Sequence, residues 1–262
     1  MMRAMWSAAA GMNVQTVNMD TISNNLANIN TTGFKKSRAE FQDLLYQTIN
    51  TAGTNTTSTT TYPGNIQIGH GARLTAMVKE FTTGSLKNTS NQFDMAIEGA
   101  GFFRVTMPDG TFAYTRDGSF SVDQNGNLVT ANGNPLDPQI TIPQDATSVT
   151  IATDGTVSVT QPGQTAPQQV GQITISNFIN TNGLNALGRN LFQPTLASGD
   201  AIDGTPGLTG LGTIQQYFLE VSNVDMAEEM VNMIIGQRAY EANSKTIQTA
   251  DSMLQLVAGL KR

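Results

Sequence analysis

Side chains that could carry out catalysis are few in this sequence and far apart. His70 is the single histidine and lies in the loop-forming run Gly69-His70-Gly71. A triad of nucleophile, histidine and carboxylate would depend on this one residue. Because the chain also lacks cysteine, a cluster of histidine or cysteine metal ligands is excluded. We therefore interpret His70 as a partly exposed loop or interface residue.

Two short motifs resemble ligand-binding loops only superficially. The run Asp123-Gln124-Asn125-Gly126-Asn127 offers oxygen ligands, but Asn134 stands where a calcium loop needs its terminal glutamate. The run Glu98-Gly99-Ala100-Gly101 lacks the rest of a phosphate-binding loop and precedes an expected strand. The methionines at helical spacing favour core packing over a copper site. We expect no catalytic residue, no cofactor and no metal.

The composition favours contacts with identical copies over contacts with nucleic acid. Charged residues make up 13% of the 262 residues, and the formal net charge is −6. The 14 basic residues are scattered, so no phosphate-binding patch is expected. A surface of uncharged polar residues can meet copies of itself without like-charge repulsion. No apolar run is long enough for membrane insertion, and the N-terminal pattern argues against a cleaved signal peptide.

The N-terminal segment has apolar residues on alternating three- and four-residue steps, which predicts a long helix over residues 1–28. This spacing forms a heptad seam in which Gln15 is the one polar occupant. The apolar members of the seam are Met5, Ala8, Met12, Met19, Ile22, Leu26 and Ile29. A single amphipathic helix packed on its own domain explains this stretch equally well.

The C-terminal segment carries a second heptad pattern, which predicts a helix from about residue 223 to 259. Ser222 and Asn223 offer N-cap oxygens. Asp225, Glu228 and Glu229 place negative charge at the positive end of the helix dipole. One row of the seam is Met226, Met233, Tyr240, Ile247 and Leu254, and the other is Glu229, Gly236, Asn243, Ala250 and Val257.

Two such helices at opposite ends of one chain are expected to pair with each other, and the chain between them makes that pairing antiparallel. The seam contains small residues such as Gly236 and polar ones such as Gln15, so the pair buries little apolar area to offset its ordering entropy. Apolar residues outside the seam need other partners: Trp6, Val17, Val231, Ile235 and Leu256. We therefore predict that the two ends polymerise with neighbouring copies.

Between the helices, short alternating runs separated by Asp-Gly and Asn-Gly pairs predict antiparallel hairpins with type I′ turns. The expected strands span 101–107, 111–116, 119–122, 128–131, 148–153, 156–161 and 170–178, with another at 216–221. The predicted fold class is α+β, with long N- and C-terminal helices forming an antiparallel coiled-coil-like pair and a central all-β domain.

The expected organisation has five parts. An N-terminal helix over 1–30 leads into a connecting segment over 31–93, which carries a Thr-rich insertion at about 46–66. An all-β domain over 94–197, a return connection over 198–222 and a C-terminal helix over 223–262 follow. From Thr51 to Thr61, seven of eleven residues are threonine. This stretch cannot build a core, so in the free chain it should be disordered or extended.

Three segments resemble the bacterial flagellar rod and hook proteins. The first is residues 23–35, with Asn24, Asn28, Gly33, Phe34 and Lys35, and the second is residues 94–103. The third combines Glu220-Val221-Ser222-Asn223-Val224-Asp225 with the run 237–245, which includes Gln237, Arg238 and Tyr240. Gly33 suits a positive-φ helix C-cap, after which Phe34 would pack back on the helix.

The length and the insertion after Tyr46 are most similar to the distal-rod subunit of that family, with a proximal-rod or hook-type subunit as the alternative. The resemblance implies a structural subunit that polymerises helically into a hollow, rigid, torque-transmitting shaft across the periplasm. It also implies proximal-rod subunits, hook protein, P/L ring proteins and the flagellar type III export apparatus as partners. The insertion would become ordered against neighbouring subunits.

Two other functions remain open from the residues alone. An extracellular β binding module could use its terminal helices merely as an anchor to a partner. An enzyme that uses His70 would lose activity but keep assembly when that residue is changed to alanine.

Overall fold

The computed structural model describes residues 2–53, 63–163, 166–208 and 210–259, and the chain divides into two compact units. Unit 1 consists of Met1–Leu26, Ser37–Val78 and Asp225–Arg262, and unit 2 of Ala27–Lys36 and Lys79–Val224. Residues far apart in the sequence therefore meet inside each unit. Most of the Thr-rich stretch, residues 54–62, lies outside the described residues, together with the expectation placed on it.

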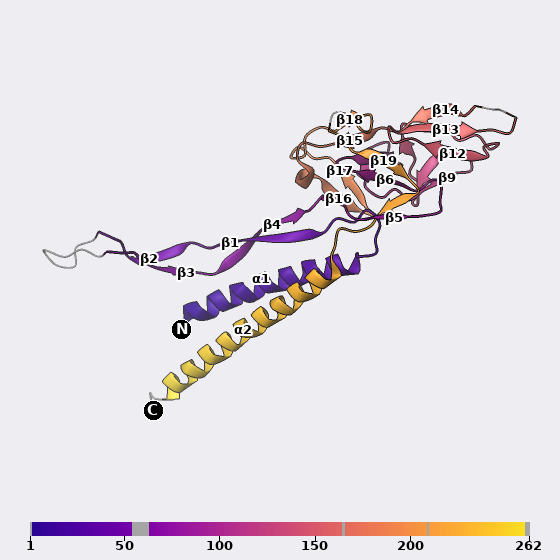
Figure 1. Ribbon diagram of the computed structural model, residues 1–262. Helices are drawn as coiled ribbons and strands as arrows, with labels where there is room; N and C mark the ends of the chain where they lie inside the picture. Colours follow the sequence, from indigo (N-terminus) through magenta and orange to yellow (C-terminus); the bar gives the residue numbers. More distant parts are fainter. Residues whose placement is uncertain (1, 54–62, 164–165, 209, 260–262) are drawn as a thin grey trace. The chain divides into compact units, whose positions relative to one another are not determined.

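Unit 1 contains the two long helices, α1 (Met2–Ala27) and α2 (Met226–Gly259). They lie side by side in Figure 1 and run in opposite directions. Gly11 of α1 lies against Asn243 of α2, and Gly236 of α2 lies against Met19 of α1. Since the residue numbers rise along one helix as they fall along the other, the pair is antiparallel. The predicted α+β class and helix pair are confirmed. Neither helix, within the described residues, is long and apolar enough to cross a membrane.

The N-cap of α2 differs from the sequence-based expectation. Asp225 Oδ1 accepts hydrogen bonds from the backbone N–H groups of Ala227 (2.8 Å) and Glu228 (3.2 Å). Asp225 is therefore the N-cap, and the expectation for Ser222 and Asn223 was wrong. The physical reason is that their side chains are used elsewhere: Ser222 Oγ accepts from the Val224 N–H, and Asn223 bonds backbone groups within unit 2.

A β ribbon completes unit 1, in a region for which the sequence indicated only a connecting segment. Strand β1 (Ser37–Asp43) pairs with β4 (Ala72–Lys79), and β2 (Tyr46–Asn50) pairs antiparallel with β3 (Ile66–Gly69). The loop between β3 and β4, which contains the half-buried His70, lies against α1, with Gly71 touching Ala10. None of the residues in these four strands is fully buried, and the strands lack the alternating apolar pattern that identifies a half-buried strand.

Unit 2 is built from β strands, and its largest sheet has seven. The path through that sheet is β16 (Asn185–Gly188), β17 (Leu191–Gln193), β8 (Phe112–Thr115), β7 (Phe102–Thr106), β15 (Ile175–Asn177) and β18 (Ile202–Gly204), and β11 (Leu136–Asp137) also pairs with β7. A second sheet joins β12 (Ser148–Ile151), β13 (Thr156–Thr160) and β14 (Gln168–Gln172). Three strand pairs complete the unit: β9 (Phe120–Val122) with β10 (Leu128–Thr130), β6 (Met95–Glu98) with β19 (Thr213–Gln216), and β5 (Leu86–Asn88) with β20 (Phe218–Glu220).

Four of the predicted hairpin turns form, but with another geometry. In the β9–β10 turn, Asp123 N donates to Asn127 O (2.9 Å) and Gly126 N donates to Asp123 O (2.8 Å). This pattern is a three-residue loop closed by a glycine with positive φ, and the loops around Gly110, Gly133 and Gly155 repeat it. Type I′ turns were therefore the wrong expectation, because the residue before each glycine keeps a negative φ. Asp117-Gly118 joins β8 to β9, which do not pair.

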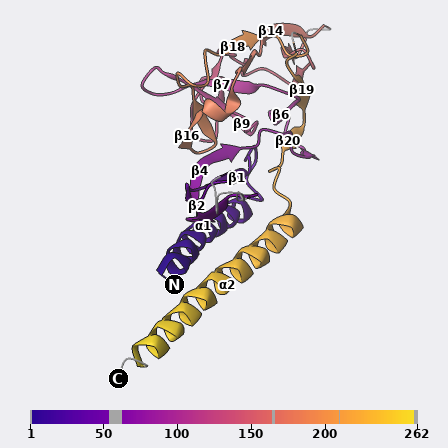
Figure 2. The same cartoon turned by 90° about the vertical axis from the view of Figure 1, so that its left-hand side faces the viewer.

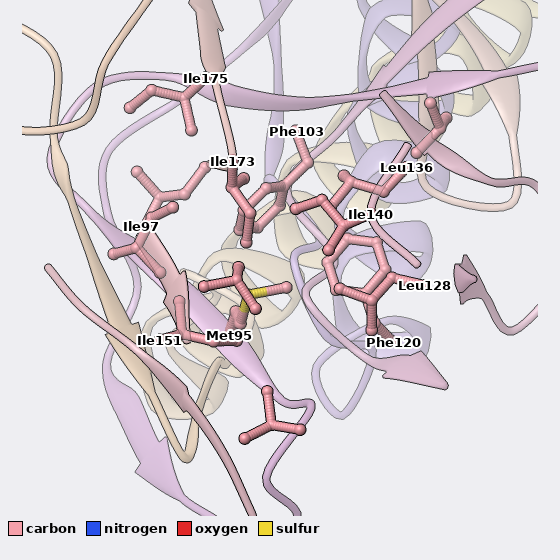
Figure 3. Packing of buried hydrophobic residues seen from close by; sticks show 14 of the residues in the cluster. Met95, Ile97, Phe103, Phe120, Leu128, Leu136, Ile140, Ile151, Ile173 and Ile175 are labelled. Atoms are coloured by element: carbon pink, nitrogen blue, oxygen red, sulfur yellow. The ribbon is translucent and has the colours of Figure 1, made fainter. Parts of the chain in front are cut away.

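Strand β7 separates two apolar clusters because its successive side chains point to opposite faces. Phe103 and Val105 enter the main core, whose members point toward one another in Figure 3. Phe102 enters a smaller cluster with Tyr114, Phe178, Leu184 and Phe192. Phe103 also meets Phe120 edge-on, with ring centroids 5.2 Å apart.

The strand predicted over 216–221 is interrupted. Tyr217 has a φ of 67°, and this residue separates β19 from β20. Its carbonyl accepts a hydrogen bond from Thr89 N, and its own N–H donates to Asp94 O. The break lets one short segment pair first with β6 and then with β5.

Candidate assembly surface and the buried motif junction

The predicted seam residues differ in how far the helix pair covers them. Ile22 is buried, whereas Met226 and Tyr240 are exposed. Those that are half-buried are Met5, Met12, Met19, Leu26, Met233, Ile247 and Leu254. Ile29 is also half-buried but lies two residues beyond the end of α1. On α2, the closest approach to α1 is made by the row that contains the buried residues Glu229, Gly236 and Ala250.

Helix α2 leaves a large apolar surface exposed. The exposed apolar residues along it are Met226, Met230, Val231, Ile234, Ile235, Tyr240, Met253, Leu256 and Val257. Trp6 of α1 is 73% exposed, while Val17 is half-buried. Gln237 and Arg238 of the C-terminal motif are exposed, and Arg238 pairs with Glu241 one turn on at 3.2 Å. An exposed apolar surface of this extent is typical of a protein contact site.

A buried amide in unit 1 joins α1 to both of its neighbours. Asn25 is 2% exposed, and it exchanges two hydrogen bonds of 2.9 Å with the backbone of Ser37 at the start of β1. Its Nδ2 also donates to Glu229 Oε1 of α2 (3.4 Å). Asn25 was not a predicted site residue, and Glu229 was predicted only as a seam position and as a charge at the start of the helix. The available signal was the placement of polar side chains at or beside seam positions.

Three charged side chains from distant parts of the chain meet in a buried cluster in unit 2. Lys35 Nζ lies 2.6 Å from Glu220 Oε1, and Arg116 Nη1 lies 3.6 Å from Glu220 Oε2. The side chains of Lys35 and Glu220 are fully buried, and that of Arg116 is 2% exposed. Because an unpaired buried charge is strongly disfavoured, Glu220 is the group that allows both cations to be buried.

The Lys35–Glu220 pair is further bonded to the segment that precedes β5. Lys35 Nζ donates to Thr82 O at 2.6 Å, and the Gly84 N–H donates to Glu220 Oε1 at 2.8 Å. Burial lowers the pKa of Lys35, and the adjacent Glu220 carboxylate offsets part of that shift. The pair therefore fixes the backbone of three segments at one point.

Arg116 follows β8 and links the cluster to the entry of the β region. Its Nη1 donates to Ile97 O (3.2 Å) and its Nη2 to Gly99 O (2.6 Å). Its guanidinium carbon lies 5.6 Å from the centroid of the Phe102 ring. Arg116 was not a predicted site residue, and Glu220 was noted only as the first residue of the C-terminal motif, because no local pattern reveals that a charge is buried.

Gly33 positions Lys35, but not as a helix C-cap. It does have the expected positive φ, 66°, yet α1 ends at Ala27, so the C-cap expectation was wrong. Gly33 N donates to Glu220 O (2.9 Å), and a Cβ built on Gly33 would lie 2.6 Å from Asp117 N. The residue is thus clamped between β20 and the end of β8. Close packing against backbone explains the need for glycine here.

Replacing Gly33 with alanine should lower the free energy of unfolding of unit 2 by more than about 3 kcal/mol, since backbone strain of ~1–2 kcal/mol adds to the clash with Asp117. Gly110→Ala is the matched control. Gly110 has a φ of 80° but open space around its Cβ position, so a loss of about 1–2 kcal/mol is expected. Urea unfolding followed by circular dichroism measures both. Equal losses of stability in the two variants would contradict the close packing of Gly33 between β20 and the end of β8.

The other N-terminal motif residues lie around the same turn. Asn24 is exposed on α1, and Asn28 Oδ1 accepts a hydrogen bond from Thr31 Oγ1 (3.2 Å) just after the helix. Phe34 is half-buried, with Lys79 Nζ 5.4 Å from its ring centroid.

Across the described ranges, no three carboxylate or histidine side chains gather in a way that could hold a metal ion.

Comparison with known proteins identifies the three motif-bearing segments. Residues 5–35 match the family described as flagella basal body rod protein, residues 96–159 the flagellar hook protein FlgE/F/G D1 domain, and residues 215–260 the flagellar basal body rod FlgEFG protein C-terminal region. The flagellar basal-body rod protein FlgG of Borreliella burgdorferi is 53% identical over 264 residues, which cover 100% of both chains. The chain belongs to the FlgG family of flagellar rod proteins.

Other FlgG proteins match along their whole length as well. That of Buchnera aphidicola subsp. Acyrthosiphon pisum is 52% identical over 99% of this chain and 100% of its own, and that of Bacillus subtilis is 41% identical over 100% of both. The hook protein FlgE of Helicobacter mustelae is 43% identical over 51% of this chain but only 30% of its own. These full-length matches favour a structural subunit of the distal rod, located in the flagellar basal body, over the hook-type alternative.

The three charged residues of the buried cluster come from the three segments that match the flagellar family. Lys35 lies in the first matched segment, Arg116 in the second and Glu220 in the third. Each of the three family segments thus supplies one charged group to a single buried site. The cluster is the point at which the two terminal motifs and the β region of this FlgG-family chain are joined.

Proposed function

We propose that copies of this chain polymerise helically, through α1 and α2, into a hollow, rigid shaft that transmits torque. The observation that supports this is the row of exposed apolar residues along α2, including Val231, Ile235 and Leu256. A surface helix of a globular protein that acts as a monomer normally buries its apolar face. Neighbouring copies would complete the packing that one antiparallel pair leaves unfinished, and each contact alone would be weak.

In this proposal the helices form the inner tube and unit 2 the outer one. The low charged fraction of 13% allows dense packing of identical surfaces. The seam and motif residues act as contacts between copies or as supports for those contacts. Catalysis has no part in the proposal, because the chain acts by mechanical coupling.

The wider setting is also proposed from the family. The shaft would span the periplasm and contact proximal-rod subunits at one end and hook protein at the other, with the P/L ring proteins around it. Subunits would leave the cell through the flagellar type III export apparatus. Neither nucleic acid nor direct membrane insertion is involved. A proximal-rod position would be distinguished by locating the tagged subunit along isolated basal bodies.

Removing residues 1–30 or 223–262 tests the role of the two ends. Both truncations keep Lys35, Arg116 and Glu220, so unit 2 should retain its fold while polymerisation is lost. Electron microscopy scores the polymer, and amide hydrogen exchange of the β strands scores the fold. Rods formed by either truncated chain would overturn the proposal.

A further inference from the structure

Two aliphatic side chains stand almost fully in solvent at one end of unit 2. Leu196 is fully exposed, and Ile179 is 85% exposed. They belong to neighbouring loops, since Asn180 N donates to Ser198 O and Asn180 Nδ2 donates to Ala197 O (3.0 Å). We call this pair of side chains the knob.

The backbone under the knob is firmly held. Ser198 is 1% exposed, and its hydroxyl donates to Thr195 O (2.8 Å) while accepting from Thr195 N (2.9 Å). Thr195 Oγ1 donates to Gly183 O (2.6 Å), which ties the two loops together again. Because the loops are already ordered, a partner that covers the knob pays little conformational entropy. Two exposed apolar side chains on such ordered loops indicate a binding contact.

A recess of about 300 Å³ lies at the opposite end of the same unit. Its apolar lining is Phe93, Val122, Ile142, Pro143, Ala146 and Val149, and its other lining residues are Gln92, Asp123, Gln124, Gly126 and Gln144. The two knob loops meet beside η1 (Thr181–Gly183), a 3₁₀ helix that precedes β16 and is drawn in Figure 1 as a short coiled ribbon. In Figure 1, β9 and β12, which carry Val122 and Val149, lie at the far end of unit 2 from β16 and this coiled ribbon. In Figure 2 that coiled ribbon faces the viewer and β9 lies behind it. Since a water molecule takes up about 30 Å³, a recess of this volume could hold several waters, and an aliphatic side chain can occupy the same space.

We propose that the knob of one copy enters this recess on the next copy along the polymer. Knob and recess lie on opposite ends of one unit, so the contact is head-to-tail and can repeat from copy to copy, as a helical filament requires. The two loops that carry the knob, residues 178–185 and 193–199, contain no charged residue, so they add no charge to a recess that already contains the carboxylate of Asp123 at its lining. This inference rests on the proposed function.

The size of the contact also favours a second copy. Two side chains bury far less than the ~1,200 Å² of a stable interface, so the knob cannot hold a separate partner by itself. In a polymer whose helices already bring the copies together, a small contact acts at high effective concentration. It would fix the orientation of unit 2 relative to its neighbour.

Cysteine crosslinking tests the contact directly, because the chain has no cysteine of its own. A chain carrying both Leu196→Cys and Val122→Cys would be assembled into basal bodies in cells and treated with a short bifunctional maleimide. Both positions are exposed, so the substitutions should leave the fold intact. The expected result is a ladder of covalent dimers, trimers and higher multimers with loss of the monomer band.

The single-cysteine chains are the matched controls. Each should stay monomeric, and rods that contain both single variants should yield dimers only. Normal rods without a ladder would overturn the inference and leave the proposed function standing. Dimers from Leu196→Cys alone, which would place knob against knob, or a crosslink to a different protein would overturn it too. Failure of the unaltered chain to form rods would instead refute the proposed function.

Discussion

Replacing Glu220 with glutamine is expected to lower the free energy of unfolding of unit 2 by about 3–5 kcal/mol. Glu220 is the carboxylate that lies between Lys35 and Arg116, at 2.6 Å and 3.6 Å. Glutamine keeps the size of the side chain but removes the charge, so two buried cations would face each other. Lys35 would then have to lose its proton, or the cluster would have to open to water.

Two further variants separate loss of the buried charge from loss of a side chain. Lys35→Met leaves Glu220 with Arg116 and the Gly84 N–H, so it should destabilise unit 2 less than Glu220→Gln. Glu241→Gln breaks the exposed pair with Arg238 and should change stability by less than about 0.5 kcal/mol. Urea unfolding of the free chain measures all three. If Glu220→Gln were no more harmful than Glu241→Gln, the cluster would have no structural importance.

The cluster also explains where the chain can be cut. Gly33, Lys35 and Glu220 belong to unit 2 although they lie beside the terminal helices in sequence. A β fragment that starts at residue 94 would lack Lys35 and the paired strand β5, and one that ends at 197 would lack Glu220 and β19. Such a fragment would leave Arg116 buried without its carboxylate. We therefore expect that 94–197 alone folds poorly.

The sequence predicts best the elements whose pattern is local. The helices follow from a heptad that continues for several turns, and the hairpins follow from Asp-Gly and Asn-Gly pairs between alternating strands. The ribbon of β1 to β4 could not be found this way, because its two faces are both largely exposed and no alternation results. The turn type was wrong since an Asn-Gly pair fits both a two-residue and a three-residue loop.

The buried site could be predicted only in part, for a related reason. Lys35 was selected through its motif, but nothing in the run around Arg116 or Glu220 distinguishes a buried charge from a surface one. Burial of a charge depends on three segments that are some 80 to 180 residues apart meeting in space. Likewise, Asn25 is buried because β1 returns to α1, and that return is a property of the fold.

Replacing Ile235 with aspartate is expected to abolish rod formation, and with it motility, while leaving the free chain folded. Ile235 is 61% exposed on α2, so the free chain loses little packing and about 0.5 kcal/mol of helix propensity. In the proposed polymer this surface is buried against a neighbour, where a carboxylate without a partner costs several kcal/mol. The penalty recurs at every subunit, so it prevents growth rather than weakening one contact.

Gln248→Asp is the matched control, because it adds the same charge at an exposed polar position of the same helix. Rods should still form with it, and swimming in soft agar and electron microscopy of basal bodies would score both variants. Circular dichroism of the purified chains checks that the two remain equally folded. Normal rods with Ile235→Asp would mean that this face of α2 stays in contact with water in the polymer. The contacts between copies would then have to come from unit 2 and the β ribbon.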